Sequence, residues 1–188
     1  MLELFLSGIL GFASVGGSQV ACPDVDAASD DHLMGVCSPL VTEYPAYSVT
    51  YRASLSPQPA SQQVMIYGRD DGWMLSIVGY RWTPGSEVIL TRRQKIAISN
   101  DDAQRLSNRL TEASMKQLLA LPYYGPGDQI CTDGATNEVA MSKGGKKVIA
   151  QQHSCAGKTL INEISAAFRE LALEYDPEFE GLLSGLEN

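Results

Sequence analysis

The chain has two histidines, and acid–base chemistry at either one would need a nearby carboxylate or nucleophile. His32 lies next to Asp31 and two residues after Asp30, so this stretch could supply the base and the orienting carboxylate of a hydrolase. The nucleophile is missing from the pattern, because no serine lies in a Gly-x-Ser-x-Gly motif. His153 precedes Cys155 by two residues, and that pair would need a free thiolate. A secreted hydrolase using His32 with Asp30 or Asp31 is therefore an alternative, and we predict no catalytic residue.

Metal and cofactor chemistry finds equally little support in the sequence. Asp24, Asp26 and Asp30 offer the oxygen ligands that calcium prefers, but the glycine and the final glutamate of an EF-hand loop are absent. The cysteines lack the Cys-x-x-Cys spacing of zinc and thiol-redox sites. No phosphate-binding loop, dinucleotide fingerprint or zinc-protease motif occurs. We therefore predict neither a metal nor a cofactor.

The four cysteines fall into two local pairs, Cys22 with Cys37 and Cys131 with Cys155. Four cysteines allow three connectivities, and short sequence separation favours the local one. Disulfides persist in oxidising compartments such as the periplasm or the extracellular space. The pattern predicts two disulfides in an extracytoplasmic protein, and the alternative is four buried thiols in a cytosolic one.

The N-terminal stretch supports the same location. Residues 2–15 are mostly apolar or small, as in the core of a secretory signal, and the run is too short for a good membrane span. The pattern departs from a normal signal because no Lys or Arg precedes Arg52. Residues 18–22 resemble a lipoprotein cleavage box ending at Cys22, with Gln19 in place of the usual aliphatic residue. We predict that residues 1–21 are a signal peptide or an N-terminal anchor of a periplasmic or secreted protein.

Composition and charge limit the partners. The 188 residues are 44% hydrophobic and carry a net charge of -8, with a pI near 4.7. An acidic chain of this kind is poorly suited to nucleic acid or to anionic membrane surfaces, so only the N-terminal segment is expected to meet a membrane. The length suits one domain, which we place at residues 22–188 with an acidic C-terminal tail.

The best-specified structure is a β-hairpin centred on Gly144 and Gly145, which tolerate the positive φ of tight turns. Alternation then sets the register, because a slip of one residue would mix the apolar and polar faces. The predicted facing pairs are Met141 with Val148, Val139 with Ala150, Glu138 with Gln151, and Thr136 with His153. Cys131 and Cys155 bracket this hairpin.

Alternating hydrophobicity and turn residues predict further strands before the hairpin. These strands cover residues 47–55, 64–69, 73–82, 87–93 and 95–99, with 73–82 expected to be central. Amphipathic helices are expected from the Ser99–Asp102 cluster to Pro122 and over residues 158–175. The predicted fold is α+β: an antiparallel meander of about five strands plus the Cys-bracketed hairpin, with two helices packed on one face.

Aromatic residues beside arginines are typical of protein interfaces. The predicted partner-binding residues are Trp82, Arg81, Arg92, Arg93, Tyr123 and Tyr124. The alternative uses are core packing for the aromatic rings and solvated strand edges for the arginines. The sequence thus predicts a non-enzymatic exported domain that binds a protein partner. A structural envelope component held by its N-terminal segment is another alternative.

A local resemblance points the same way. The segment from Leu118 to Cys155 resembles uncharacterised bacterial exported proteins, in which a Leu-Pro loop precedes Asp-Gly, a strand glutamate and a glycine turn. The matching residues here are Leu121-Pro122, Asp133-Gly134, Glu138 and Gly144-Gly145. The resemblance implies export and implies no activity.

Overall fold

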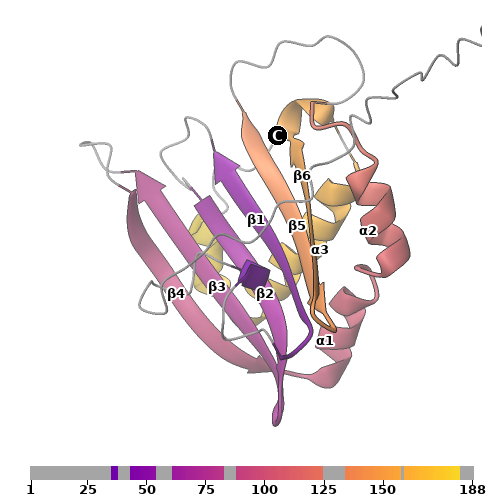
Figure 1. The fold of residues 1–188 in the computed structure, drawn as a ribbon. Coiled ribbons are helices and arrows are strands. Elements are labelled where there is room, and N and C mark those ends of the chain that lie inside the picture. Colours follow the sequence, from indigo (N-terminus) through magenta and orange to yellow (C-terminus); the bar gives the residue numbers. More distant parts are fainter. Residues whose placement is uncertain are drawn as a thin grey trace, which may run out of the picture.

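The computed structural model describes residues 35–37, 43–53, 61–82, 88–124, 134–157 and 159–182. These residues form a six-stranded antiparallel sheet with three α-helices, so the predicted α+β class is confirmed (Figure 1). The strands are β1 (Ala46–Ala53), β2 (Ser61–Arg69), β3 (Gly72–Trp82), β4 (Val88–Ile98), β5 (Ala135–Lys143) and β6 (Lys146–His153). The helices are α1 (Asn100–Ser107), α2 (Glu112–Leu119) and α3 (Leu160–Tyr175), with short 3-10 turns η2 (Gly35–Cys37), η4 (Ser154–Ala156) and η5 (Pro177–Leu182).

The sheet is built around β1. The strand order is β4-β3-β2-β1-β5-β6, so β1 pairs with β2 on one side and with β5 on the other. The first four strands form the predicted meander, and the late hairpin extends it through the β1–β5 pairing. The prediction that residues 73–82 form the central strand is wrong, because β3 is second from the β4 edge.

The register of the hairpin confirms the sequence prediction. Met141 faces Val148, and Glu138 faces Gln151. Gly144 and Gly145 form the turn with φ of 56° and 74°, a left-handed conformation that glycine adopts without steric cost. Because Cys131 lies outside the described residues, the bracketing of this hairpin by two cysteines stays a prediction.

The predicted strand count is corrected at β4. Residues 87–93 and 95–99 were expected as separate strands, but β4 runs without a break from Val88 to Ile98. Gln94 keeps its place in the ladder opposite Ile77, and it is not a residue that forces a turn. The irregularity lies instead between Gly79 and Tyr80, where the register shifts as in a β-bulge. The described meander therefore has four strands.

The helix expected before Pro122 is two helices, so three α-helices replace the predicted two. Ser99 caps α1, its side chain accepting from the Asp102 N–H, and Thr111 caps α2 by accepting from the Ser114 N–H. A side chain that satisfies an open backbone N–H favours a new helix start. The break between α1 and α2 leaves the apolar stripe intact, because Leu110 in the connection is 1% exposed.

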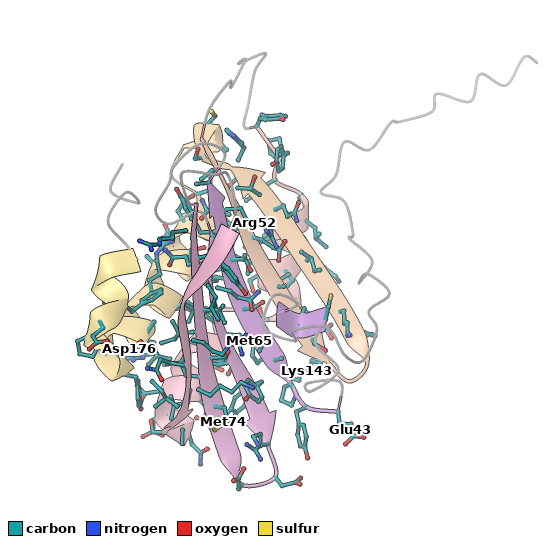
Figure 2. All side chains as sticks on the ribbon, turned by 90° about the vertical axis from the view of Figure 1, so that its left-hand side faces the viewer. Glu43, Arg52, Met65, Met74, Lys143 and Asp176 are labelled. Atoms are coloured by element: carbon teal, nitrogen blue, oxygen red, sulfur yellow. The ribbon has the colours of Figure 1, made fainter. Side chains whose placement is uncertain are left out.

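The three helices cover one face of the sheet, and η2 lies on the opposite face (Figure 2). Phe168 of α3 and Leu75 of β3 are fully buried in the core between helices and sheet. Phe179 of η5 is also fully buried there, so the start of the acidic tail is packed. On the other face, Val36 and Cys37 of η2 pack on a smaller cluster that includes Met65. None of the helices in the described ranges is long and apolar enough to span a bilayer.

Candidate functional site

The predicted partner-binding residues separate into two groups at opposite edges of the sheet. Arg81 and Arg93 are exposed on β3 and β4, and Arg92 and Trp82 lie on the same two strands. Tyr123 and Tyr124 lie beside β6, since the His153 N–H donates to the Tyr123 carbonyl at 2.7 Å. Five strand spacings of about 4.8 Å separate β4 from β6, or about 24 Å. The two groups therefore cannot form one patch.

The tyrosine pair is held in a defined position. The hydroxyls of Tyr123 and Thr136 are hydrogen-bonded at 2.7 Å, which fixes the Tyr123 ring across the end of β6. Tyr124 packs edge-on against Tyr123 with ring centroids 4.7 Å apart, and its centroid lies 5.3 Å from that of His153. Tyr124 nevertheless remains 50% exposed. An aromatic ring is thus presented to solvent on an ordered support.

His153 is part of that support. The predicted register places it opposite Thr136 in the hairpin, and the structure shows that it is only 8% exposed. Its Nδ1 accepts from the Cys155 N–H at 3.3 Å, so in the neutral ring the proton is on Nε2. Gly134 leaves the space that the ring needs, because a Cβ at this position would lie 2.6 Å from His153 Cε1. The histidine is buried because the tyrosine segment and Gly134 close around it.

A charged group lies on the next row of the same face. Glu138 Oε2 accepts from Arg52 Nη1 at 3.0 Å and from Gln151 Nε2 at 2.7 Å. The Glu138 side chain is only 12% exposed, whereas that of Arg52 is 46% exposed. We name this continuous region the Tyr124 surface; it consists of Arg52, Tyr123, Tyr124, Thr136, Glu138, Gln151 and His153.

The described contacts of the Tyr124 surface differ from those of a proton-transfer site. A triad histidine donates from Nδ1 to a carboxylate, but His153 Nδ1 accepts from a backbone N–H. Glu138 is already engaged by two donors, so it is not a free general base. Within the described ranges, no group of three His, Cys, Asp or Glu residues could hold a metal ion. His32, Asp30 and Asp31, the residues of the hydrolase alternative, lie outside the described residues.

The cysteines that the structure describes are not free thiols. Cys37 and Cys155 are both disulfide-bonded. Cys22 and Cys131 lie outside the described residues, so the predicted pairing stays a prediction. A disulfide-bonded Cys155 cannot act as a thiolate nucleophile with His153.

Several residues of the Tyr124 surface were missed as candidate site residues. The predicted hairpin register already placed Thr136 opposite His153 and Glu138 opposite Gln151, and this pairing is confirmed. The approach of Tyr123 to β6 could not be inferred, because residues 124–145 separate the two and residues 125–133 among them show no periodic pattern. The same holds for Arg52, which reaches this surface only because β1 pairs with β5.

Comparison with known proteins adds no relative to this picture. No family model matches the sequence, and no curated protein shows significant similarity to it. The resemblance of the segment from Leu118 to Cys155 to exported bacterial proteins therefore stays a prediction. The function of this chain has to be inferred from the chemistry of its own residues.

Proposed function

We propose that this protein is a non-enzymatic exported domain that binds a protein partner through the Tyr124 surface. The observation that carries the proposal is the half-exposed Tyr124 ring, packed on Tyr123 and His153. Interface residues that contribute most to binding are often tyrosines and arginines. They contribute more when their side chains are already held in place before binding, because less conformational entropy is then lost. The tyrosine here is supported by neighbouring rings, and the exposed Arg52 lies on the same face.

The location of the protein outside the cytosol is part of the proposal. Disulfides persist outside the reducing cytosol, and Cys37 and Cys155 are disulfide-bonded. We pair Cys22 with Cys37 and Cys131 with Cys155, and we assign residues 1–21 to the export signal or anchor. The extracytoplasmic location agrees with the apolar N-terminal stretch of the sequence.

Site-specific photocrosslinking tests the binding surface. A photoreactive p-benzoylphenylalanine replaces Tyr124 in one variant and Leu90 in a control, because Leu90 of β4 is also exposed, at 41%, on the opposite edge strand. The expected result is a discrete crosslinked partner from position 124 and none from position 90. The same crosslinks from both positions, or none from either in the native host, would contradict the proposal.

Truncation gives an independent measure of the same surface. Tyr124→Ala is expected to weaken capture of the crosslinked partner at least about tenfold, as for a contact near the centre of an interface. Leu90→Ala should leave capture unchanged. Urea unfolding checks that both variants stay folded, because both side chains are only about half exposed and Tyr124 also packs against Tyr123 and His153.

A further inference from the structure

A polar crevice lies between α3 and the sheet, on the face opposite the Tyr124 surface. Its polar lining is Tyr51, Gln62 and Asn137 from the strands and Ser165 and Arg169 from α3. The empty space around these side chains is about 180 Å³, including the part open to solvent, and it is too narrow to admit a water molecule. Val49 and Val64 complete the wall, so the crevice combines donor groups with an apolar background.

Within the described ranges Arg169 lacks a carboxylate partner, in contrast to Arg52 and Arg105. Arg52 and Arg105 form ion pairs with Glu138 and Glu174. Arg169 is partly buried, and burial lowers its pKa, whereas the nearby Tyr51 acts in the opposite sense. Within the described ranges Arg169 makes no hydrogen bond or ion pair. Removing a guanidinium from water without an opposite charge beside it costs free energy, so an unpaired, partly buried arginine is a candidate for a binding role.

Ser165 faces the same crevice and also lacks a polar partner. It lies one helical turn before Arg169, so the two side chains are neighbours on one face of α3. Ser165 is 2% exposed, and its Oγ has no hydrogen-bond partner. Buried hydroxyls are almost always hydrogen-bonded in native proteins. Two adjacent groups that can donate thus lack an acceptor.

The other polar groups of the lining can also act as donors. Burial raises the pKa of Tyr51, so its hydroxyl stays protonated, while the nearby Arg169 charge acts in the opposite sense. Asn137 is 7% exposed and brings an amide into the same wall. The lining contains one cation and no carboxylate. The component that would compensate Arg169 and Ser165 is therefore an acceptor that carries about one negative charge, whereas Gln62 Oε1, which also lacks a hydrogen-bond partner, needs a donor.

We propose that this crevice binds the carboxylate group of a ligand, with Arg169 as the cation and Ser165 as a hydrogen-bond donor. A carboxylate matches the planar guanidinium in a two-point contact and carries one charge. A doubly charged phosphate would leave one charge uncompensated beside Val49 and Val64. Because the free crevice is too narrow for water, its lining side chains must separate when the ligand enters.

Titration of the full-length, ¹⁵N-labelled protein tests the proposal. Butyrate is added at constant ionic strength against chloride, and the Arg169 Nε–Hε resonance is followed by NMR. We expect a saturable shift in the native protein, at least tenfold weaker binding in Arg169→Gln, and weakened binding in Ser165→Ala. Arg109→Gln is the matched control, since Arg109 is exposed and is not among the residues that line the crevice.

Two further arms define the ligand. Phosphate should bind more weakly than butyrate. A short peptide with a free C-terminus, compared with its amidated form, distinguishes a peptide carboxylate from that of a small organic acid. The absence of a saturable shift with butyrate and the free peptide would overturn the proposal, as would equal binding by native protein and Arg169→Gln. Arg169→Lys keeps the charge and the stem, so it provides a second variant should Arg169→Gln fail to fold.

Discussion

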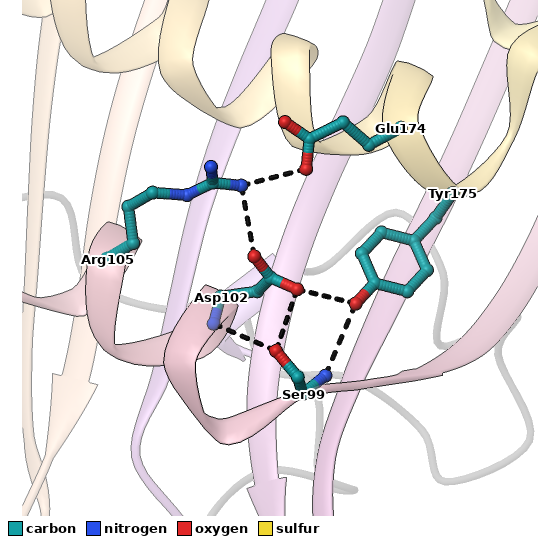
Figure 3. A network of polar contacts seen from close by, with 5 residues as sticks. All are labelled: Ser99, Asp102, Arg105, Glu174 and Tyr175. Carbon is teal, nitrogen blue, oxygen red and sulfur yellow. Dashed lines mark hydrogen bonds and ion pairs between the residues drawn. The ribbon is translucent and has the colours of Figure 1, made fainter.

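The hydroxyl of Tyr175, the last residue of α3, donates to Oδ2 of Asp102 in the first turn of α1 at 2.6 Å (Figure 3). The same hydroxyl accepts from the Ser99 N–H at 3.3 Å, and Ser99 Oγ donates to Asp102 Oδ2 at 2.7 Å. The group ties the start of α1 to the end of α3, residues more than 70 positions apart in the sequence. Arg105 spans the same gap to Glu174, but both side chains are about half exposed and such pairs stabilise little.

Removing this hydroxyl should lower stability. Tyr175→Phe deletes a bond to a charged acceptor that is partly shielded from water, so we expect a loss of about 1 to 2 kcal/mol. Urea unfolding measures the change. Tyr44→Phe is the control, because the Tyr44 hydroxyl also donates to an aspartate, Asp70, but in an exposed position. An equal loss in the two variants would show that the α1–α3 link adds nothing beyond a surface bond.

The Asp102 carboxylate should make stability depend on pH. The hydrogen bonds from Tyr175 and from Ser99, and then the charge of Arg105, lower the pKa of Asp102 below its ordinary value of 3.8. A lowered folded-state pKa means that this stabilisation is complete above 3.8 and is lost as pH falls through the folded value. Asp102→Asn should therefore be less stable than the native protein near neutral pH, and its stability should fall less on acidification. Urea midpoints of both proteins from about pH 7 to about pH 2.5 measure this. The same dependence of the midpoint on pH in the two proteins would contradict the expectation.

Gly134 should tolerate alanine worse than a glycine of similar backbone conformation. Its φ is 146°, and a Cβ would lie 2.6 Å from both His153 Cε1 and Ser154 Oγ. Gly72 has a φ of 136° with nothing within 4 Å of the same position. Both substitutions carry backbone strain, but only Gly134→Ala adds a clash, which should cost about 1 to 3 kcal/mol more. Urea unfolding of both variants tests this, and equal losses would show that the His153 region yields at little cost.

Disulfide pairing has a direct chemical test. Mass spectrometry of an unreduced digest should find peptides that link Cys131 with Cys155 and Cys22 with Cys37. The first bond closes a loop of roughly 25 residues, so replacing both of its cysteines by serine should cost about 3 to 4 kcal/mol. A peptide that links Cys37 to Cys155, or four reactive thiols in the native protein, would rule out the proposed pairing.

Local features of this fold could be read from the sequence. The Gly144-Gly145 turn and strict alternation are enough to set the register of β5 against β6, because each face of a two-stranded unit must be uniform. Likewise, the Ser99 cap marked the start of α1. The second cap, Thr111, has the same chemistry, but the continuous apolar stripe made one helix appear sufficient.

The placement of distant elements was decided by tertiary structure. The sequence pattern of β1 does not predict that its second neighbour is β5. The sequence likewise does not predict that Tyr123 lies beside the end of β6. The same is true of the crevice, where Tyr51 and Arg169 share a wall although one is a strand residue and the other lies late in α3. Short-range patterns reflect neighbours along the chain, whereas the choice among free strand edges and helix faces depends on burying all of them together. The sequence by itself therefore determined the strands and helices and which face of each is apolar. Tertiary packing decided which of their side chains come into contact.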